Sequence, residues 1–145
     1  MLLLILYSNI YAIVMPRKKI EDRQDISLLV RSFYDKIRAD KEIGPFFNEM
    51  ITDWEPHLEK LTDFWEMNLF GGKMYKGNPL EAHNKADDHF GNTISSNEFG
   101  IWLNLWFETL EELFEGENVE ILKRRARKMG TFLMVSIYEN RAKNK

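Results

Sequence analysis

The sequence predicts an all-α protein, and three observations support this fold class. The chain has 145 residues, which is enough for one ordinary domain and too short for two. Apolar residues recur at the three- and four-residue spacing of amphipathic helices, and no run alternates in the manner of a strand. Glycine, proline and capping residues divide the periodic stretches into separate helices.

We expect residues 16–145 to form this single domain and residues 1–15 to be an apolar extension. The extension, "MLLLILYSNIYAIVM", is shorter than the roughly 20 residues of a spanning helix. No basic residue precedes it, as one would in a secretory signal. Two interpretations stay open: translation starts at Met15, or the stretch is a membrane anchor with "PRKK" on the cytoplasmic side.

The first helix is predicted in "DISLLVRSFYDKIRAD", with Asp25 as its N-cap. Its buried face comprises Ile26, Leu29, Val30, Phe33 and Ile37. Tyr34 follows Val30 by four residues, which places it at the inner edge of that face. Gly44 and Pro45 in "KEIGPFF" then break the pattern.

A second helix is predicted in "WEPHLEKLTDFWEMNLF", with Pro56 in its first turn. Its apolar face comprises Leu58, Leu61, Phe64, Trp65 and Leu69. His57 precedes Leu61 by four residues, so it also points inward. The stretch "GGKMYKGNP" is predicted to be a loop.

A short third helix should begin at Asn78-Pro79-Leu80-Glu81, which places His83 just over one turn inside it. After the loop "GNTISSN", Ser95 and Glu98 form a capping-box signature. The helix that follows should end at Gly116 and present on one face Phe99, Trp102, Leu103, Trp106, Leu110 and Leu113. The last helix is predicted to bury Val119, Leu122, Ala126, Met129, Phe132, Leu133 and Ile137.

The composition disfavours several classes of protein. A net charge of −3 and a pI near 5.7 argue against a nucleic-acid-binding protein, which needs a basic surface. The cluster "KRRARK", residues 123–128, alternates with core positions and is interpreted as a solvated helix face. The chain has no cysteine, so a metal must be held by His, Asp or Glu or arrive in a cofactor. We expect a cytoplasmic protein.

His83 and His89 cannot bind one metal ion from a regular helix, because six residues leave them about 120° apart around its axis. His89 is expected at the helix end, exposed and favoured by the helix dipole. The sequence contains no HExxH motif and no pair of ExxH helices, which argues against a zinc or di-iron site. The sequence also contains no GxSxG motif and no glycine-rich phosphate loop, which argues against a hydrolase and against a nucleotide-binding protein.

His83, His57 and Tyr34 face inward from three predicted helices, and two tryptophans line a fourth. Polar groups in so aromatic a core need partners, since burial without them is costly. A haem would supply both an apolar plate and a metal.

The succession "FYDKIRADKEIGPFFNEMI", "WEPHLEKLTDFW", "YKGNPLEAH" and "FGIWLNLWFETL" resembles the truncated haemoglobins, in particular their third group. The resemblance covers roughly residues 25 to 140. It implies a globin-like, truncated two-over-two helical sandwich around one haem b, with His83 as the proximal iron ligand. One departure is the stretch between His83 and Trp102, which is longer than expected for the family and carries "ADDHF".

The resemblance also implies roles for residues of the haem pocket. Tyr34 and Trp102 would donate hydrogen bonds to a bound ligand, and His57 would be a distal histidine that can act as a gate. Phe47 would wedge the haem, and Trp65 would form part of the pocket wall. Without the resemblance, Phe47, Trp65 and Trp102 would be core residues, the Tyr34 hydroxyl could bind a backbone carbonyl, and His57 could reach solvent.

The function implied is binding of O2, NO or CO, with NO or peroxide detoxification or oxygen supply at low oxygen as the physiological role. A separate reductase is expected, because the sequence has no flavin or nicotinamide motif. Two alternatives stay open. One is a peroxidase-like haem enzyme, and the other is a haem-free helical interaction module that residues 1–15 could tether to a membrane.

Overall fold

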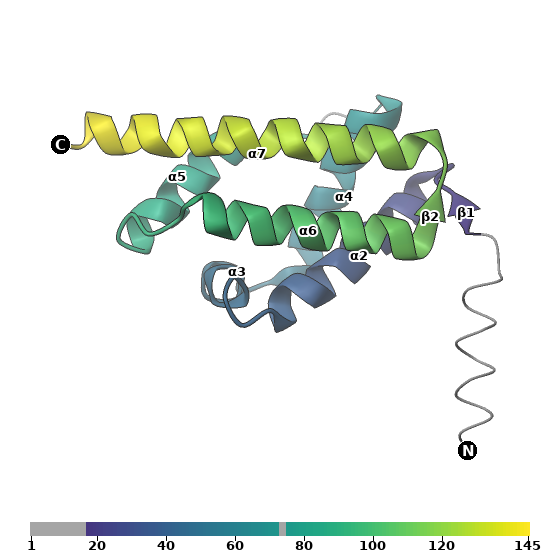
Figure 1. Cartoon of the computed structure of the whole chain (residues 1–145), viewed down its shortest axis with the longest axis horizontal. Helices are drawn as coiled ribbons and strands as arrows, with labels where there is room; N and C mark the ends of the chain where they lie inside the picture. The colour runs from purple at the N-terminus through teal and green to yellow at the C-terminus, as the bar shows by residue number, and fades with distance from the viewer. Residues whose placement is uncertain (1–16, 73–74) are drawn as a thin grey trace, which may run out of the picture.

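The protein consists of six helices and one minimal parallel sheet, as a computed structural model shows for residues 17–72 and 75–145 (Figure 1). The elements are β1 (Lys18–Lys19), α2 (Arg23–Ala39), α3 (Gly44–Met50), α4 (Trp54–Phe70), α5 (Pro79–His89), α6 (Ser96–Leu113), β2 (Phe114–Glu115) and α7 (Glu117–Lys143). The apolar extension predicted for residues 1–15 lies outside the described residues. No helix among the described ranges is long and apolar enough to cross a membrane.

Two helix pairs build the fold. Helix α2 packs on α4, and α6 packs on α7 after the chain reverses at β2 (Figure 1). Contacts between α2 and α6 join the two pairs, and α5 packs chiefly on α7. The all-α fold class predicted from the sequence is therefore confirmed.

The start of α2 differs from the prediction. Its N-cap is Asp22, whose carboxylate accepts a hydrogen bond from the Asp25 backbone N–H at 3.1 Å. Asp25 lies in the first turn, buried, and accepts from Lys18 Nζ at 2.6 Å and from the Glu21 N–H at 2.8 Å. The prediction of Asp25 as the cap was wrong because two aspartates three residues apart can both cap, and the earlier one adds a turn.

The end of α6 also differs from the prediction. The helix ends at Leu113 rather than at Gly116, because Phe114 and Glu115 are extended and pair in parallel with Lys18 and Lys19. The prediction of no strand was thus wrong here, since two residues are too few to show alternation. Gly116, with φ 102°, turns the chain into α7 in a conformation that a side chain would strain.

Two other predictions need correction. Residues Gly44–Met50, predicted only as a break, form the short helix α3, with Pro45 accommodated in its first turn. Phe132, predicted to be buried, is 56% exposed on α7. Leu133 and Ile137, which follow it on α7, are buried, so the helix is covered at this point. Phe132 is exposed because it lies about 100° around the helix axis from Leu133, away from the covered face.

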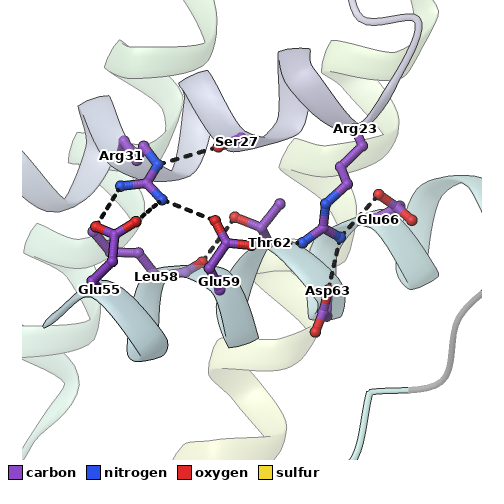
Figure 2. A network of polar contacts seen from close by, with 9 residues as sticks. All are labelled: Arg23, Ser27, Arg31, Glu55, Leu58, Glu59, Thr62, Asp63 and Glu66. Atoms are coloured by element: carbon purple, nitrogen blue, oxygen red, sulfur yellow. Dashed lines mark hydrogen bonds and ion pairs between the residues drawn. The ribbon is translucent and has the colours of Figure 1, made fainter. Parts of the chain in front are cut away.

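A polar network fixes α4 against α2 along one edge of this pair (Figure 2). Arg23 binds Asp63 at 2.7 Å, Glu59 at 3.0 Å and Glu66 at 3.2 Å. Arg31 binds Glu55 at 2.7 Å and the same Glu59 at 2.9 Å. Each exposed pair contributes little stability, but the shared carboxylate sets the register of the two helices. That register brings Tyr34 of α2 close to His57 of α4.

Candidate ligand-binding site

A cavity of about 490 Å³ lies inside the fold, and all six helices contribute to its lining. Its volume is in the range of small-molecule and cofactor pockets, and its walls are mostly apolar. The structure brings all six residues singled out from the sequence to this one cavity: Tyr34, Phe47, His57, Trp65, His83 and Trp102.

His83 is held on α5 in a defined orientation. As predicted, Asn78 caps this helix, accepting the Glu81 N–H at 3.2 Å, and Pro79 occupies the first turn. The Nδ1 atom of His83 lies 2.7 Å from the Pro79 carbonyl oxygen. Because a carbonyl can only accept, Nδ1 carries the proton and Nε2 keeps a lone pair. Burial lowers the pKa of His83, against an opposing effect of this hydrogen bond, so the ring is neutral at neutral pH.

Tyr34 and His57 form a second group of polar aromatic side chains on the cavity. Their ring centroids are 6.2 Å apart, and the two planes are almost perpendicular. Phe47 packs against Tyr34 at 5.9 Å, and Trp54 contacts both rings of the pair. None of the described aromatic contacts joins His83 to this group; His83 instead faces Phe99 at 6.3 Å. The cavity therefore has one histidine in one part of its lining and several donors in another.

Both polar groups of this second cluster are uncharged near neutral pH. Burial raises the pKa of Tyr34 far above its ordinary value, and a hydrogen bond with the Trp102 side chain lowers this pKa by a smaller amount. Burial lowers the pKa of His57, and the nearby Lys60 adds to this effect. Tyr34 can thus act as a neutral O–H donor.

Three indole rings stack from the cavity into the core. Trp102 and Trp106 are nearly parallel with centroids 6.2 Å apart, and Trp106 stacks on Trp65 at 4.5 Å. The Trp106 Nε1–H donates to the Leu122 carbonyl at 3.2 Å. Trp65 is only 3% exposed and also lines the cavity, so it serves both as core and as pocket wall.

Several residues at or beside the cavity were missed at the sequence level. Trp54 packs on two of the lining residues, Tyr34 and His57, and its place three residues before His57 on α4 could have identified it. Tyr75 belongs to the glycine-rich loop, where no periodicity indicates an orientation, yet it lines the cavity and packs on Phe64 at 5.1 Å. Lys60 lies 5.8 Å above the Tyr75 ring and supplies a cation at the cavity.

His89 occupies the position predicted for it. It is the last residue of α5, is exposed, and its Nε2 lies 2.9 Å from the Glu49 carboxylate. It is not part of the cavity lining. Within residues 17–72 and 75–145, no group of three His, Asp or Glu side chains is arranged to hold a bare metal ion.

A buried ion pair anchors the far end of α5. Asp87 is fully buried and accepts from Arg141 of α7 at 2.7 and 2.8 Å, from the Ile94 N–H at 3.1 Å and from Asn92 at 3.0 Å. Arg141 also donates to the Ile94 carbonyl at 2.6 Å. One turn separates Asp87 from His83, so this clamp fixes the helix that carries the histidine.

Two crossed helix pairs around an apolar cavity that holds one oriented, neutral histidine define a globin-like helical protein. The family model of bacterial-like globins matches residues 18–138, and the chain belongs to this family. It is 30% identical over 122 residues to the group 3 truncated hemoglobin ctb of Campylobacter jejuni, covering 81% of this chain and 92% of that protein.

Solved structures agree with this assignment. The crystal structure of the group III truncated hemoglobin from Campylobacter jejuni superposes with a TM-score of 0.75 and 29% identity, over 84% of this chain and 95% of the other. The 2/2 hemoglobin of a Synechococcus species, solved in the cyanomet state with covalently attached heme, gives a TM-score of 0.62. At 19% identity over 79% of this chain and 90% of that one, the second match shows the fold alone. The resemblance to truncated haemoglobins is therefore confirmed.

Proposed function

We propose that the protein binds one haem b in this cavity through Nε2 of His83, and that it binds O2, NO or CO there. The observation that carries the proposal is the orientation of His83. Its Nδ1–H is fixed on the Pro79 carbonyl, so the neutral ring offers the Nε2 lone pair as a metal ligand. The relatives named hemoglobin support the same cofactor.

The lining suits a haem in chemistry as well as in size. Phe46, Phe47, Phe64, Phe99 and Leu133 present apolar surface to a macrocycle. Bound haem would supply an iron with an open coordination position and one-electron redox chemistry. Within the described residues no three His, Asp or Glu side chains gather to hold a bare ion, so a cavity of about 490 Å³ with His83 on its wall suits such a group better.

The second polar group would act on the bound diatomic ligand. Tyr34, with its O–H, and Trp102, with its indole N–H, are donors at the same cavity and stabilise a ligand on which negative charge develops. His57, partly buried and neutral, lines the cavity and packs on Trp54, and we propose that it controls entry to the cavity. Strong retention by two donors suits redox turnover better than release of oxygen.

We infer NO dioxygenation as the reaction that such a site serves best. In this reaction NO, O2 and one electron give nitrate, so each turnover consumes one electron from a separate reductase. The apolar lining supports it, because exclusion of water limits loss of the reactive ligand. The cytoplasm, where such reductases are soluble, is the expected compartment.

The visible absorption spectrum tests the cofactor and its ligand. The full chain should show a Soret band that shifts with CO, and His83→Ala should lose or alter this band. His89→Ala is the matched control, since His89 is an exposed histidine of the same helix away from the cavity. A folded, colourless protein that does not bind added haem would refute the proposal. An absorption spectrum of His83→Ala identical to that of the parent would refute it as well.

The stacked indoles favour a peroxidase-like reaction as a second candidate. Trp102 and Trp106 are parallel within 4°, and Trp65 continues the stack. Such a chain offers aromatic rings that can pass single electrons from a reductant to the cavity. Hydrogen-peroxide-driven oxidation of a phenolic reductant measures it, and Trp106→Phe should slow this activity while CO binding stays unchanged.

A further inference from the structure

A second hollow, of about 540 Å³, lies between the C-terminal part of α4 and the first half of α7. It is lined by Asn68, Arg124, Arg125, Lys128, Met129 and Phe132. We call this set the basic hollow. Half of its residues are cations, although the whole chain carries a net charge of −3.

The cations of the basic hollow are not neutralised. Within the described part of the chain, none of Arg124, Arg125 and Lys128 forms an ion pair with a carboxylate. Arg125 donates to the Asn68 carbonyl, and Lys128 lies 5.9 Å above the ring of Phe132. By contrast, Arg23, Arg31 and Arg141 are each bound by carboxylates. The hollow is thus a local site of positive potential.

The basic hollow also has an apolar centre next to the ligand cavity. Phe132, at 56%, is the most exposed large hydrophobic side chain described. Met129 lines both the basic hollow and the ligand cavity, so the two share this side chain as part of their walls. A molecule seated in the hollow would therefore contact a residue that also lines the ligand cavity.

We propose that the basic hollow is the docking surface of an electron-donor protein whose own surface is acidic. This rests on the proposed function, because a haem that turns over with O2 and NO needs one electron at a time from outside. A charged rim steers a complementary partner, and an apolar centre provides the close contact. Transient redox complexes use small interfaces of this kind. In the complex one electron would pass from the partner's reduced flavin or iron–sulfur cluster, which is oxidised, to the ferric haem that the cavity would hold, which is reduced, and no bond would form or break.

Zero-length cross-linking tests the location of the interface. A plant-type [2Fe–2S] ferredoxin serves as the acidic probe, and a carbodiimide couples its carboxylates to lysine amines. Lys128 is the only lysine of the basic hollow, so peptide mass spectrometry should find the adduct there. Lys128→Arg should abolish this adduct while it preserves the charge. Adducts concentrated on lysines elsewhere would overturn the proposal.

Reduction kinetics test the role of the charge. Arg124→Glu with Lys128→Glu should lower the second-order rate of reduction by the reduced ferredoxin about tenfold or more at low ionic strength, an effect that salt removes. Lys41→Glu with Lys145→Glu makes the same change in net charge at exposed positions outside the hollow and should leave the rate within about twofold of the parent. Equal losses in both double variants, or none in either, would contradict the proposal.

Two further experiments distinguish a protein-docking surface from a polyanion-binding site, and a failure of this proposal from a failure of the proposed function. If the Arg124/Lys128 double variant loses binding to duplex DNA or to vesicles containing anionic lipid, yet is reduced and cross-linked by ferredoxin normally, the hollow recognises polyanions and the proposal is wrong. Cross-linking needs no haem. A colourless protein that still couples at Lys128 would therefore refute the proposed function and leave the docking surface standing, whereas a haem-loaded protein without the adduct would do the reverse.

Discussion

Asp87→Asn should destabilise the protein strongly, because it removes the charge of a fully buried partner. The carboxylate accepts two hydrogen bonds from Arg141 and one each from Ile94 N–H and Asn92. Removing one member of a buried ion pair costs about 3–5 kcal/mol, since the other charge stays behind. The Arg141 side chain is 23% exposed and so keeps some hydration, which places the expected loss near the lower end, about 3 kcal/mol. For a chain of this size that is a fall of roughly 10 °C in Tm.

Urea and thermal unfolding followed by circular dichroism measure this loss. Asp88→Asn is the matched control: the same substitution at the next residue, whose carboxylate is exposed and contacts only Asn92 and Asn140. It should cost less than about 0.5 kcal/mol, as surface substitutions do. If Asp87→Asn lost no more stability than Asp88→Asn, the assignment of a tertiary clamp to Asp87 would be refuted.

The same pair predicts a pH dependence. Burial alone would raise the pKa of Asp87, but the hydrogen bonds from Arg141 and Ile94 and the charge of Arg141 hold this pKa below the ordinary 3.8. A carboxylate with a depressed folded-state pKa contributes stability that is fully present above its unfolded pKa and is lost as the pH falls through the folded value. The difference in unfolding free energy between the parent and Asp87→Asn should therefore be constant from pH 7 to about 5 and shrink below pH 4.

Three further predictions test other contacts. Tyr34→Phe should raise the O2 dissociation rate about tenfold, measured by stopped flow, because one donor to the ligand is lost; an unchanged rate would remove Tyr34 from the distal site. Ser95→Ala should cost about 1 kcal/mol in urea unfolding, since the capping box of α6 joins Ser95 and Glu98, and Ser96→Ala, at the exposed next position, should cost clearly less. Arg23→Gln should cost at most about 1 kcal/mol, and less in high salt, because its three carboxylate partners are solvated; a loss that salt leaves unchanged would contradict this.

The cavity residues could be predicted from the sequence because each lies on a helix whose buried face repeats locally. Tyr34, His57 and Trp102 share a periodic face with aliphatic neighbours, so helical geometry turns them inward whatever the tertiary arrangement. The capping residues Asn78 and Ser95 were readable for the same reason, since a cap acts within four residues. The family resemblance was needed to relate these separate faces to one cavity.

Structural features that depend on residues far apart in the chain could not be predicted from the sequence in this way. The short pairing of β1 with β2 joins residues almost a hundred positions apart, and two residues carry no periodicity. Phe132 fits an apolar repeat of α7, yet its exposure depends on which faces of α7 the neighbouring helices cover. Asp87 stands in "ADDHF", a stretch identified from the sequence only as a departure, and its role appears once Arg141 of the last helix is placed against it.

Helix α5 shows why local sequence signals and contacts between distant residues must be considered together. At 11 residues it is too short to be stable alone in water, so its place in the fold depends on contacts at both ends. Asn78 caps its start, while Asp87 ties its end to Arg141 and Asn84 binds Ser136 at 3.1 Å near its middle. The local cap fixes which way His83 faces on the helix, whereas the contacts with α7 fix where the helix lies. Both are needed for Nε2 to have a defined position in the cavity, so the unusual acidic stretch after His83 belongs to the support of the proposed iron ligand.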